Sequence, residues 1–136
     1  MTNSIEKTER NTSIALLLLR LTFGGLMLFS HGWGKMMKFF GEDPIRFANP
    51  LGIGEVPTLA LAVFAEVICA ILIIIGFKTR MATIPLIITM LVAVFVIHIS
   101  DPFSKMEKGI LYLVPYIAIL LAGPGKFSVD AAIGKE

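Results

Sequence analysis

The sequence predicts an all-α integral membrane protein whose four helices form an antiparallel bundle. Hydrophobic residues make up 56% of the chain, above the apolar share of ~45–50% in soluble domains. Only 16% of the residues are charged, and the mean hydropathy is +0.84. The charges cluster between apolar runs that are about as long as the ~20 residues needed to cross a bilayer. With 136 residues the chain has the length of a single domain, 1–136.

Apolar runs place four membrane spans along the chain. The first run follows a polar N-terminus that carries Lys7 and Arg10, as a signal peptide would. It is about 20 residues long, however, rather than the ~7–15 of a signal peptide, and no small-x-small cleavage site follows it. We therefore expect an uncleaved first helix. The four predicted spans are residues 13–33, 56–77, 81–99 and 107–123.

Prolines and glycines punctuate the later spans. Pro57 lies in the first turn of the second span, where proline is tolerated, and the span ends near Gly76. Pro85 lies close to the start of the third span. Pro115 predicts a kink in the fourth, which stops at Gly123-Pro124-Gly125.

The lengths of the connections predict the topology. Residues 78–80 and 100–106 are short connections, so consecutive helices should lie antiparallel. The longer connection, 34–55, mixes aromatic residues with glycine, proline and charges, and predicts an interfacial or partly re-entrant segment. An even number of spans places both termini on one side. Lysine and arginine are nearly balanced between the two sides, and the basic turn 78–80 with the N-terminal pair favours cytoplasmic termini.

Two ionisable side chains interrupt the apolar runs, and such residues usually face a bundle interior. Arg20 lies in the first span and Glu66 in the second. At 1.5 Å per residue, they are about 10 Å and about 16 Å from the same predicted bundle end, a difference that an arginine side chain covers. We expect a buried Arg20–Glu66 pair. It either fixes the helix register or forms a proton-linked or ligand-anchoring site.

A second polar cluster is predicted at the outer ends of the spans. Its members are His31, Lys35, His98, Asp101 and Glu107. Three interpretations stay open: a metal site, histidines that cap helix ends, or a pocket for a small amphipathic molecule such as a quinone head group. No HxxxH, HxxE or HExxH spacing supports the metal interpretation.

The stripe that carries His31 predicts where an apolar tail of such a ligand would lie. Arg20, Gly24, Met27, His31 and Lys35 recur at helical spacing on one face of the first span. Because glycine has no side chain, Gly24 and its neighbour Gly25 are expected to leave room for the tail.

Composition excludes several functions. The single cysteine, Cys69, cannot form an internal disulfide, a CxxC pair or a thiolate zinc site, and we interpret it as a packing residue. A net charge of +2 without a basic stripe or nucleic-acid motif excludes nucleic acid as the expected partner. The expected partners are the lipid bilayer, a quinone, a soluble redox protein and further copies of the chain.

Several motifs together resemble the DoxX family. They are His31-Gly32-Trp33-Gly34-Lys35 after a broken apolar helix, Ala65-Glu66 before Gly76-Phe77-Lys78-Thr79-Arg80, and the closing Gly123-Pro124-Gly125-Lys126-Phe127-Ser128-Val129-Asp130. The likeness extends from Leu16 to Asp130. The residues that fall on the family's polar positions are Arg20, His31, Lys35, Glu66, Arg80, His98, Glu107 and Asp130.

The resemblance implies a four-helix membrane protein of bacteria, in the cytoplasmic (inner) membrane. The family's name comes from similarity to the small membrane subunit of a thiosulfate:quinone oxidoreductase, and some relatives are linked to membrane redox complexes. The chain departs from the family at Cys69-Ala70, where paired glycines are usual, which can reshape the surroundings of Glu66. Lys126 and Phe127 replace residues of similar kind.

The predicted function is therefore that of a membrane component in a redox, sulfur or oxidative-stress system. Because no motif in the chain binds a flavin, nucleotide or haem, oxidoreduction would need a quinone or a partner oxidoreductase. The alternative is a non-enzymatic membrane scaffold, or a small-molecule channel or transporter subunit. A channel with only four spans would require a homo-oligomer.

Overall fold

The computed structural model describes residues 1–135, and every regular element in that part of the chain is helical. Three of the elements, labelled η, are π-helical turns that continue an α-helix. In chain order the elements are α1 (Thr2–Met27), η1 (Leu28–Gly32), α2 (Trp33–Met37), α3 (Glu55–Val63), η2 (Phe64–Cys69), α4 (Ala70–Ile75), α5 (Thr79–Val92), η3 (Ala93–Ile97), α6 (Phe103–Ala122) and α7 (Val129–Ala132).

These elements join into four long helices. Helix one runs continuously over Thr2–Met37, helix two over Glu55–Ile75 and helix three over Thr79–Ile97. Helix four is α6 alone, Phe103–Ala122. The last three helices lie close to the predicted spans. Helix one is much longer than its span, because its polar first turns are helical from Thr2.

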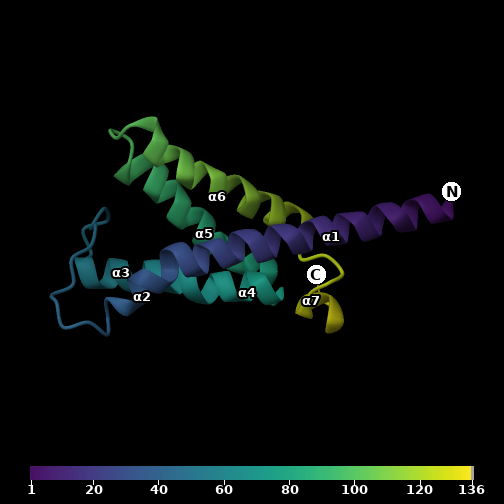
Figure 1. Ribbon diagram of the computed structural model, residues 1–136, viewed down its shortest axis with the longest axis horizontal. Helices are drawn as coiled ribbons and strands as arrows, with labels where there is room; N and C mark the ends of the chain where they lie inside the picture. Colours follow the sequence, from purple (N-terminus) through teal and green to yellow (C-terminus); the bar gives the residue numbers. More distant parts are fainter. Residues whose placement is uncertain (136) are drawn as a thin grey trace.

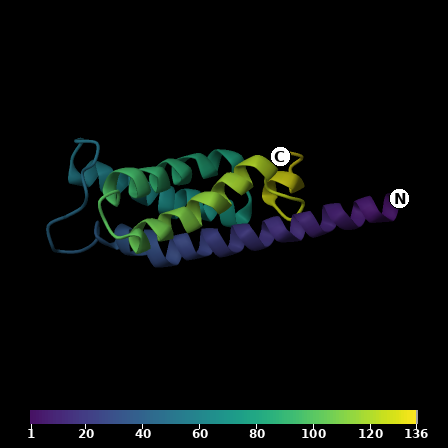
Figure 2. The same cartoon turned by 90° about the horizontal axis from the view of Figure 1, so that it is seen from above.

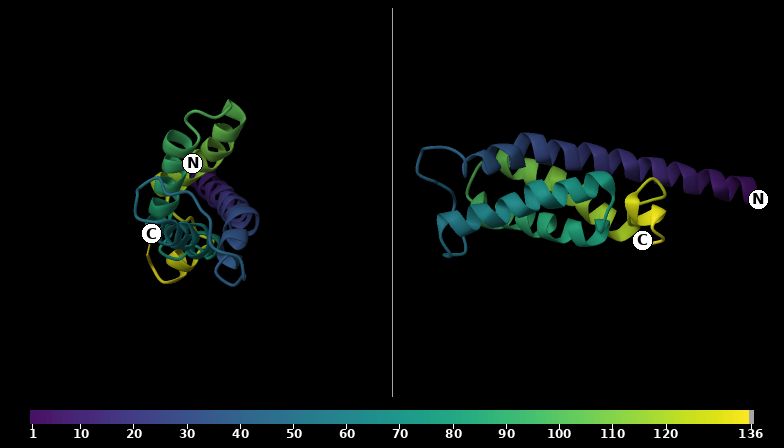
Figure 3. Two further views of the ribbon diagram at one scale, coloured as in Figure 1. Left: turned by 90° about the vertical axis from the view of Figure 1, so that its left-hand side faces the viewer. Right: turned by 90° about the horizontal axis from the view of Figure 1, so that it is seen from below.

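The four helices alternate in direction, as the short connections predict. Helix one runs from the N-terminus toward the long connection 38–54, helix two returns, and α5 and α6 repeat the alternation (Figure 1). Both chain ends lie at the same end of the bundle (Figure 2). The first turns of α1 extend beyond the other helices, and the long connection lies at the opposite end (Figure 3). The all-α fold class is therefore confirmed, and the alternating helix directions agree with the predicted antiparallel bundle.

Three of the described helices are long and apolar enough to cross a membrane, and they are helices one, two and three. Helix four is 20 residues long, but three charged residues stand in its first two turns: Lys105, Glu107 and Lys108. It lies antiparallel beside α5, with which it makes an extensive interface. That it crosses the bilayer stays a prediction.

Small residues bring the helix backbones close together. A methyl group added at Gly24 would lie 3.2 Å from the carbonyl oxygen of Ala70, and one at Gly109 would contact the Val94 side chain at 2.5 Å. Close contact through small residues is typical of helix packing in membranes. The fully buried apolar side chains are Met27, Leu59, Ala65, Ala70, Ile73, Leu86, Val94, Tyr116 and Ile119.

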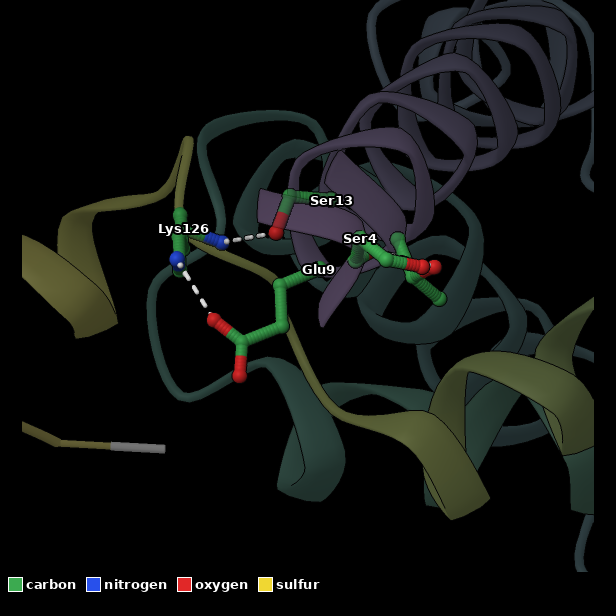
Figure 4. A network of polar contacts seen from close by, with 5 residues as sticks. Ser4, Glu9, Ser13 and Lys126 are labelled. Carbon is green, nitrogen blue, oxygen red and sulfur yellow. Dashed lines mark hydrogen bonds and ion pairs between the residues drawn. The ribbon is translucent and has the colours of Figure 1, made fainter. Parts of the chain in front are cut away.

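The C-terminal segment folds back onto the first helix. The Lys126 amide donates to Ser13 Oγ at 3.2 Å, and Lys126 Nζ lies 3.1 Å from Glu9 Oε2 (Figure 4). The ion pair is exposed, so its contribution to stability is small. These contacts nevertheless place the residues after α6 beside α1, next to the buried arginine of that helix.

Candidate functional site

Arg20 and Glu66, the two charges that interrupt the first and second predicted spans, belong to separate polar centres. The prediction that they pair is wrong. Glu66 forms its ion pair with Lys35, and Arg20 contacts backbone carbonyls at the other end of the bundle. Both side chains are buried, as residues of this type inside a bundle are expected to be.

The Arg20 guanidinium is enclosed by four carbonyl oxygens. Nε donates to Ile73 O at 2.9 Å and Nη2 to Ile74 O at 3.0 Å, at the end of helix two. Nη1 donates to Pro124 O at 2.9 Å and to Phe127 O at 2.8 Å, in the segment after α6. The final carbonyls of a helix have no partner within it, and Arg20 supplies one. This centre therefore links helix one, helix two and the C-terminal segment.

Asp130 completes the same centre. Its carboxylate accepts from the amides of Lys78 and Thr79 at 2.9 and 3.0 Å and from the Thr79 hydroxyl at 2.8 Å, so it caps the start of α5. Burial works to raise the pKa of Asp130. These hydrogen bonds and the positive charge of Arg20 outweigh burial, and hold the pKa below its ordinary value. The arrangement is that of a structural clasp.

The error in the predicted pair is an error of helix register. Gly32 packs directly on the backbone of Glu66, and Arg20 lies level with Ile73 and Ile74. At 1.5 Å per residue, the seven residues from Glu66 to Ile73 on helix two separate the two charged groups by about 11 Å along the bundle. The prediction measured depth from the start of the apolar run, but helix one continues far beyond it.

The second centre lies in a cavity of about 390 Å³ near the end of the bundle that carries the long connection. This volume falls within the range typical of small-molecule sites. Most of its walls are apolar, and they come from all four helices and from residues 47–51 of the connection. Its polar lining residues are His31, Lys35, Thr58, Glu66, Thr89, His98, Lys105, Lys108 and Tyr112.

Glu66 and Lys35 form an ion pair in the wall of this cavity. Lys35 Nζ lies 2.7 Å from Glu66 Oε1, and the Glu66 side chain is only 3% exposed. The second carboxylate oxygen, Oε2, is buried, and within residues 1–135 no group hydrogen-bonds to it. A buried acceptor without a donor is costly. Glu66 is therefore the cavity-lining residue that has a buried acceptor without a donor in the described part of the chain.

Aromatic and histidine side chains flank the pair. The His31 ring meets Tyr112 edge to face at 5.3 Å between centroids, and Tyr112 stacks on Tyr116 at 6.2 Å. The Tyr116 hydroxyl donates to Phe23 O at 2.9 Å, which ties α6 to α1. The Tyr112 ring is thus held between the His31 ring and the Tyr116 ring.

Each of the first three helices contributes a π-helical turn to this region. His31 lies in η1, Glu66 lies in η2, and Ala93, Val94 and Ile97 of η3 line the cavity. A π turn inserts a residue into an α-helix and is frequent at functional sites. Three of them around one cavity indicate that the helices are shaped to form it.

The outer cluster predicted from the sequence is only partly assembled. His98 lines the cavity, and its Nδ1 lies 2.7 Å from Asp101 Oδ2. That hydrogen bond lowers the pKa of Asp101. Glu107 is exposed and does not line the cavity. Lys108, the next residue, takes its place.

Sequence reasoning missed the contribution of α6 to the cavity. Lys105, Lys108, Gly109 and Tyr112 line it, and their spacing of three, one and three residues puts them on one helix face. That spacing was the available signal. It also separates them from Glu107, which points to another face.

The slot predicted beside Gly24 and Gly25 is absent, which corrects that expectation. Gly24 packs on helix two, where an added methyl group would lie 2.8 Å from Ile74. Gly25 faces open space, with nothing within 4 Å of such a group. Only Met27, of the residues predicted to border the slot, lines the cavity.

The metal interpretation has no geometric support in the described part of the chain. There, no three histidine, cysteine, aspartate or glutamate side chains lie close enough together to hold a metal ion. His98 and Asp101 are adjacent, but His31 contacts Tyr112 instead.

The fold and the site together define a small helical membrane protein with a largely apolar cavity between its helices, into whose wall a few polar side chains are set. The chain belongs to the DoxX family, which its sequence matches over residues 15–99. The matched region contains Arg20, His31, Lys35, Glu66 and His98.

Several curated proteins are similar along most of the chain. A protein of Haemophilus influenzae without an assigned function is 29% identical and covers 91% of this chain and 86% of its own length. A Bacillus subtilis protein printed as "Putative oxidoreductase CatD" is 27% identical, over 93% of this chain and 92% of its own. A Mycobacterium tuberculosis membrane protein is 28% identical, over 82% and 77%. No solved structure matches the chain.

Proposed function

We propose that the cavity binds the head group of a quinone and that the chain is the membrane component of a redox system. One observation carries the proposal. Glu66 Oε2 is a buried acceptor without a donor in the wall of an otherwise largely apolar cavity. A ligand hydroxyl would satisfy this oxygen, and an apolar ring would fill the space beside it.

The remaining polar groups suit both forms of such a ligand. A quinone carbonyl only accepts hydrogen bonds, and Lys35, His31 and Tyr112 all line the cavity as donors. A quinol hydroxyl also donates, and Glu66 is the acceptor. Oxidation of a quinol to a quinone releases two protons and two electrons. The Glu66 carboxylate is placed to receive one proton and the His31 imidazole the other, since both line the cavity.

The electrons of that step would pass to a soluble partner protein. The relative named CatD, whose printed name contains the word oxidoreductase, supports a redox role. We place the chain in the bacterial inner membrane with both termini in the cytoplasm, because lysine and arginine in short loops favour the cytoplasmic side. Reporter fusions at both ends should report the cytoplasm, and a tag within residues 41–49 should be accessible from outside.

The test is the quinone content of the protein purified from bacterial membranes in mild detergent. Solvent extraction and mass spectrometry give quinone per chain. Glu66→Gln and His31→Ala should each lower retention by about tenfold or more, since one charge-assisted hydrogen bond is worth ~1.5–3 kcal/mol. Glu107→Gln is the matched control, because that carboxylate is exposed at the same end of the bundle and lies outside the cavity.

Two outcomes would count against the proposal. Equal retention in Glu66→Gln and Glu107→Gln would remove Glu66 from the site. A soluble protein that co-purifies with a chain containing no quinone would favour the scaffold alternative.

A further inference from the structure

We infer that the ligand reaches the cavity sideways from the bilayer, between α3 and α5, and therefore carries a long apolar tail that lies in this opening. The inference rests on the proposed function, because it specifies the ligand class and the access route of the same cavity. It replaces the tail slot beside Gly24, which packing on helix two closes.

The opening is defined by side chains that line the cavity and are also exposed on the outside of the bundle. Leu61 on α3 and Ile88 on α5 are each 56% exposed, and both belong to the cavity lining. A residue with both properties stands at a boundary between cavity and surroundings. Leu51 and Ile97, 63% and 40% exposed, share both properties and mark a second boundary at the end that carries the long connection. In a membrane, the surroundings at Leu61 and Ile88 are lipid tails.

The opening exists because helices two and three diverge. α5 packs closely against η2 and α4, whereas α3 stands apart from it (Figure 1). The π turn η2, which carries Glu66, lies where the two helices part. Glu66 thus lies near the point where the two helices part, and the gap between them widens from there toward the bundle end that carries the long connection.

The polar residues on this side of the cavity do not make the opening hydrophilic. The Thr58 hydroxyl donates to Gly54 O at 2.6 Å, and the Thr89 hydroxyl donates to Pro85 O at 2.7 Å. Each hydroxyl is satisfied by its own helix, so the threonines offer mainly their methyl groups. The opening therefore suits a hydrocarbon chain and excludes a charged group.

The end of the cavity that faces the long connection has the opposite character. Phe47, Pro50 and Leu51 of the connection line it, together with Lys105 and Lys108. A tail leaving in that direction would pass two lysines, whereas the gap between α3 and α5 leads directly into the apolar part of the bundle. An amphiphile with its ring at Glu66 and its tail between Leu61 and Ile88 places its polar part beside the polar residues of the cavity and its apolar part in the apolar opening.

The experiment compares two probes that share one ring: a benzoquinone without a tail and the same benzoquinone with a decyl chain. Binding to the purified full chain in detergent is measured for both. Leu61→Trp and Ile88→Trp narrow the opening. Ile68→Trp and Ile84→Trp are the matched controls, because these residues are 49% and 47% exposed on the same helices but do not line the cavity.

Leu61→Trp and Ile88→Trp should weaken binding of the decyl probe by about tenfold or more, as mismatches in apolar pockets do. The tail-free probe should bind all variants within about twofold, the usual range for surface changes. An equal loss of both probes, or no loss of either, would overturn the access route while leaving the proposed function intact. Failure of both probes to bind the wild-type chain would overturn the proposed function, and this inference with it.

A photoreactive group on the decyl chain gives a second measurement that does not depend on folding of the variants. After irradiation of the wild-type complex, peptide mass spectrometry should find the label on residues of α3 and α5. Labelling confined to residues 47–51 or to α6 would overturn the inference, because the tail would then lie toward the long connection.

Discussion

Replacement of the buried arginine should be the most destabilising single change in the chain. Arg20→Leu keeps a side chain of considerable volume but removes all four hydrogen bonds that the guanidinium donates to Ile73, Ile74, Pro124 and Phe127. It also removes the positive charge beside Asp130. The contacts that Arg20 makes with the end of helix two and with the C-terminal segment should be lost together, whereas those of Asp130 with Gly76, Lys78 and Thr79 do not involve Arg20.

The size of the effect follows from two opposing quantities. Each buried carbonyl left without a donor costs about 1–3 kcal/mol. The desolvation of the guanidinium, several kcal/mol, is no longer incurred in the variant, and breaking a buried charged contact typically leaves a net loss of about 3–5 kcal/mol. For a chain of this length, that loss corresponds to a fall in Tm of about 10–20 °C.

Thermal unfolding in detergent, followed by circular dichroism, measures this effect. Arg10→Leu is the control, because Arg10 is exposed in the first turns of α1, and it should change stability by less than about 0.5 kcal/mol. Arg20→Lys should fall between the wild type and Arg20→Leu, since an ammonium group keeps the charge but not the planar fork. A Tm of Arg20→Leu equal to that of Arg10→Leu would refute the reasoning.

Two further predictions concern the other charged contacts. Lys35→Met should destabilise the chain by about 1–3 kcal/mol, which is less than the loss of a fully buried pair because Lys35 is partly exposed. Glu66→Gln in that background should restore part of the lost stability. Additivity of the two changes in a double-mutant cycle would show that the two residues do not interact. Because the folded pKa of Asp130 is lowered, its contribution is complete above the ordinary aspartate range and is lost as pH falls through the folded pKa. Between pH ~5 and ~2, the Tm of Asp130→Asn should therefore fall less steeply than the Tm of the wild type. The Tm of the control Asp43→Asn should follow that of the wild type. Parallel curves of Tm against pH for all three proteins would contradict the stabilising role of the Asp130 carboxylate.

The sequence was sufficient to predict the fold class and the approximate helix positions. Apolar runs of bilayer length, short connections and breaks such as Gly123-Pro124-Gly125 are local signals, and they determine helices largely independently of their neighbours. The same applies to the polar positions. A charge in an apolar run, such as Arg20 or Glu66, must be buried in a bundle whatever its partner is.

Which partner each charge finds was decided only by the tertiary structure. Hydropathy fixes the length of a helix but not its axial register against the next one. Here the register follows from close backbone contacts at Gly24 and Gly32. A shift of about two turns moves Glu66 from Arg20 to Lys35. The cavity likewise depends on the divergence of α3 from α5 and on three π turns, which arise from packing between helices and leave no period in the sequence.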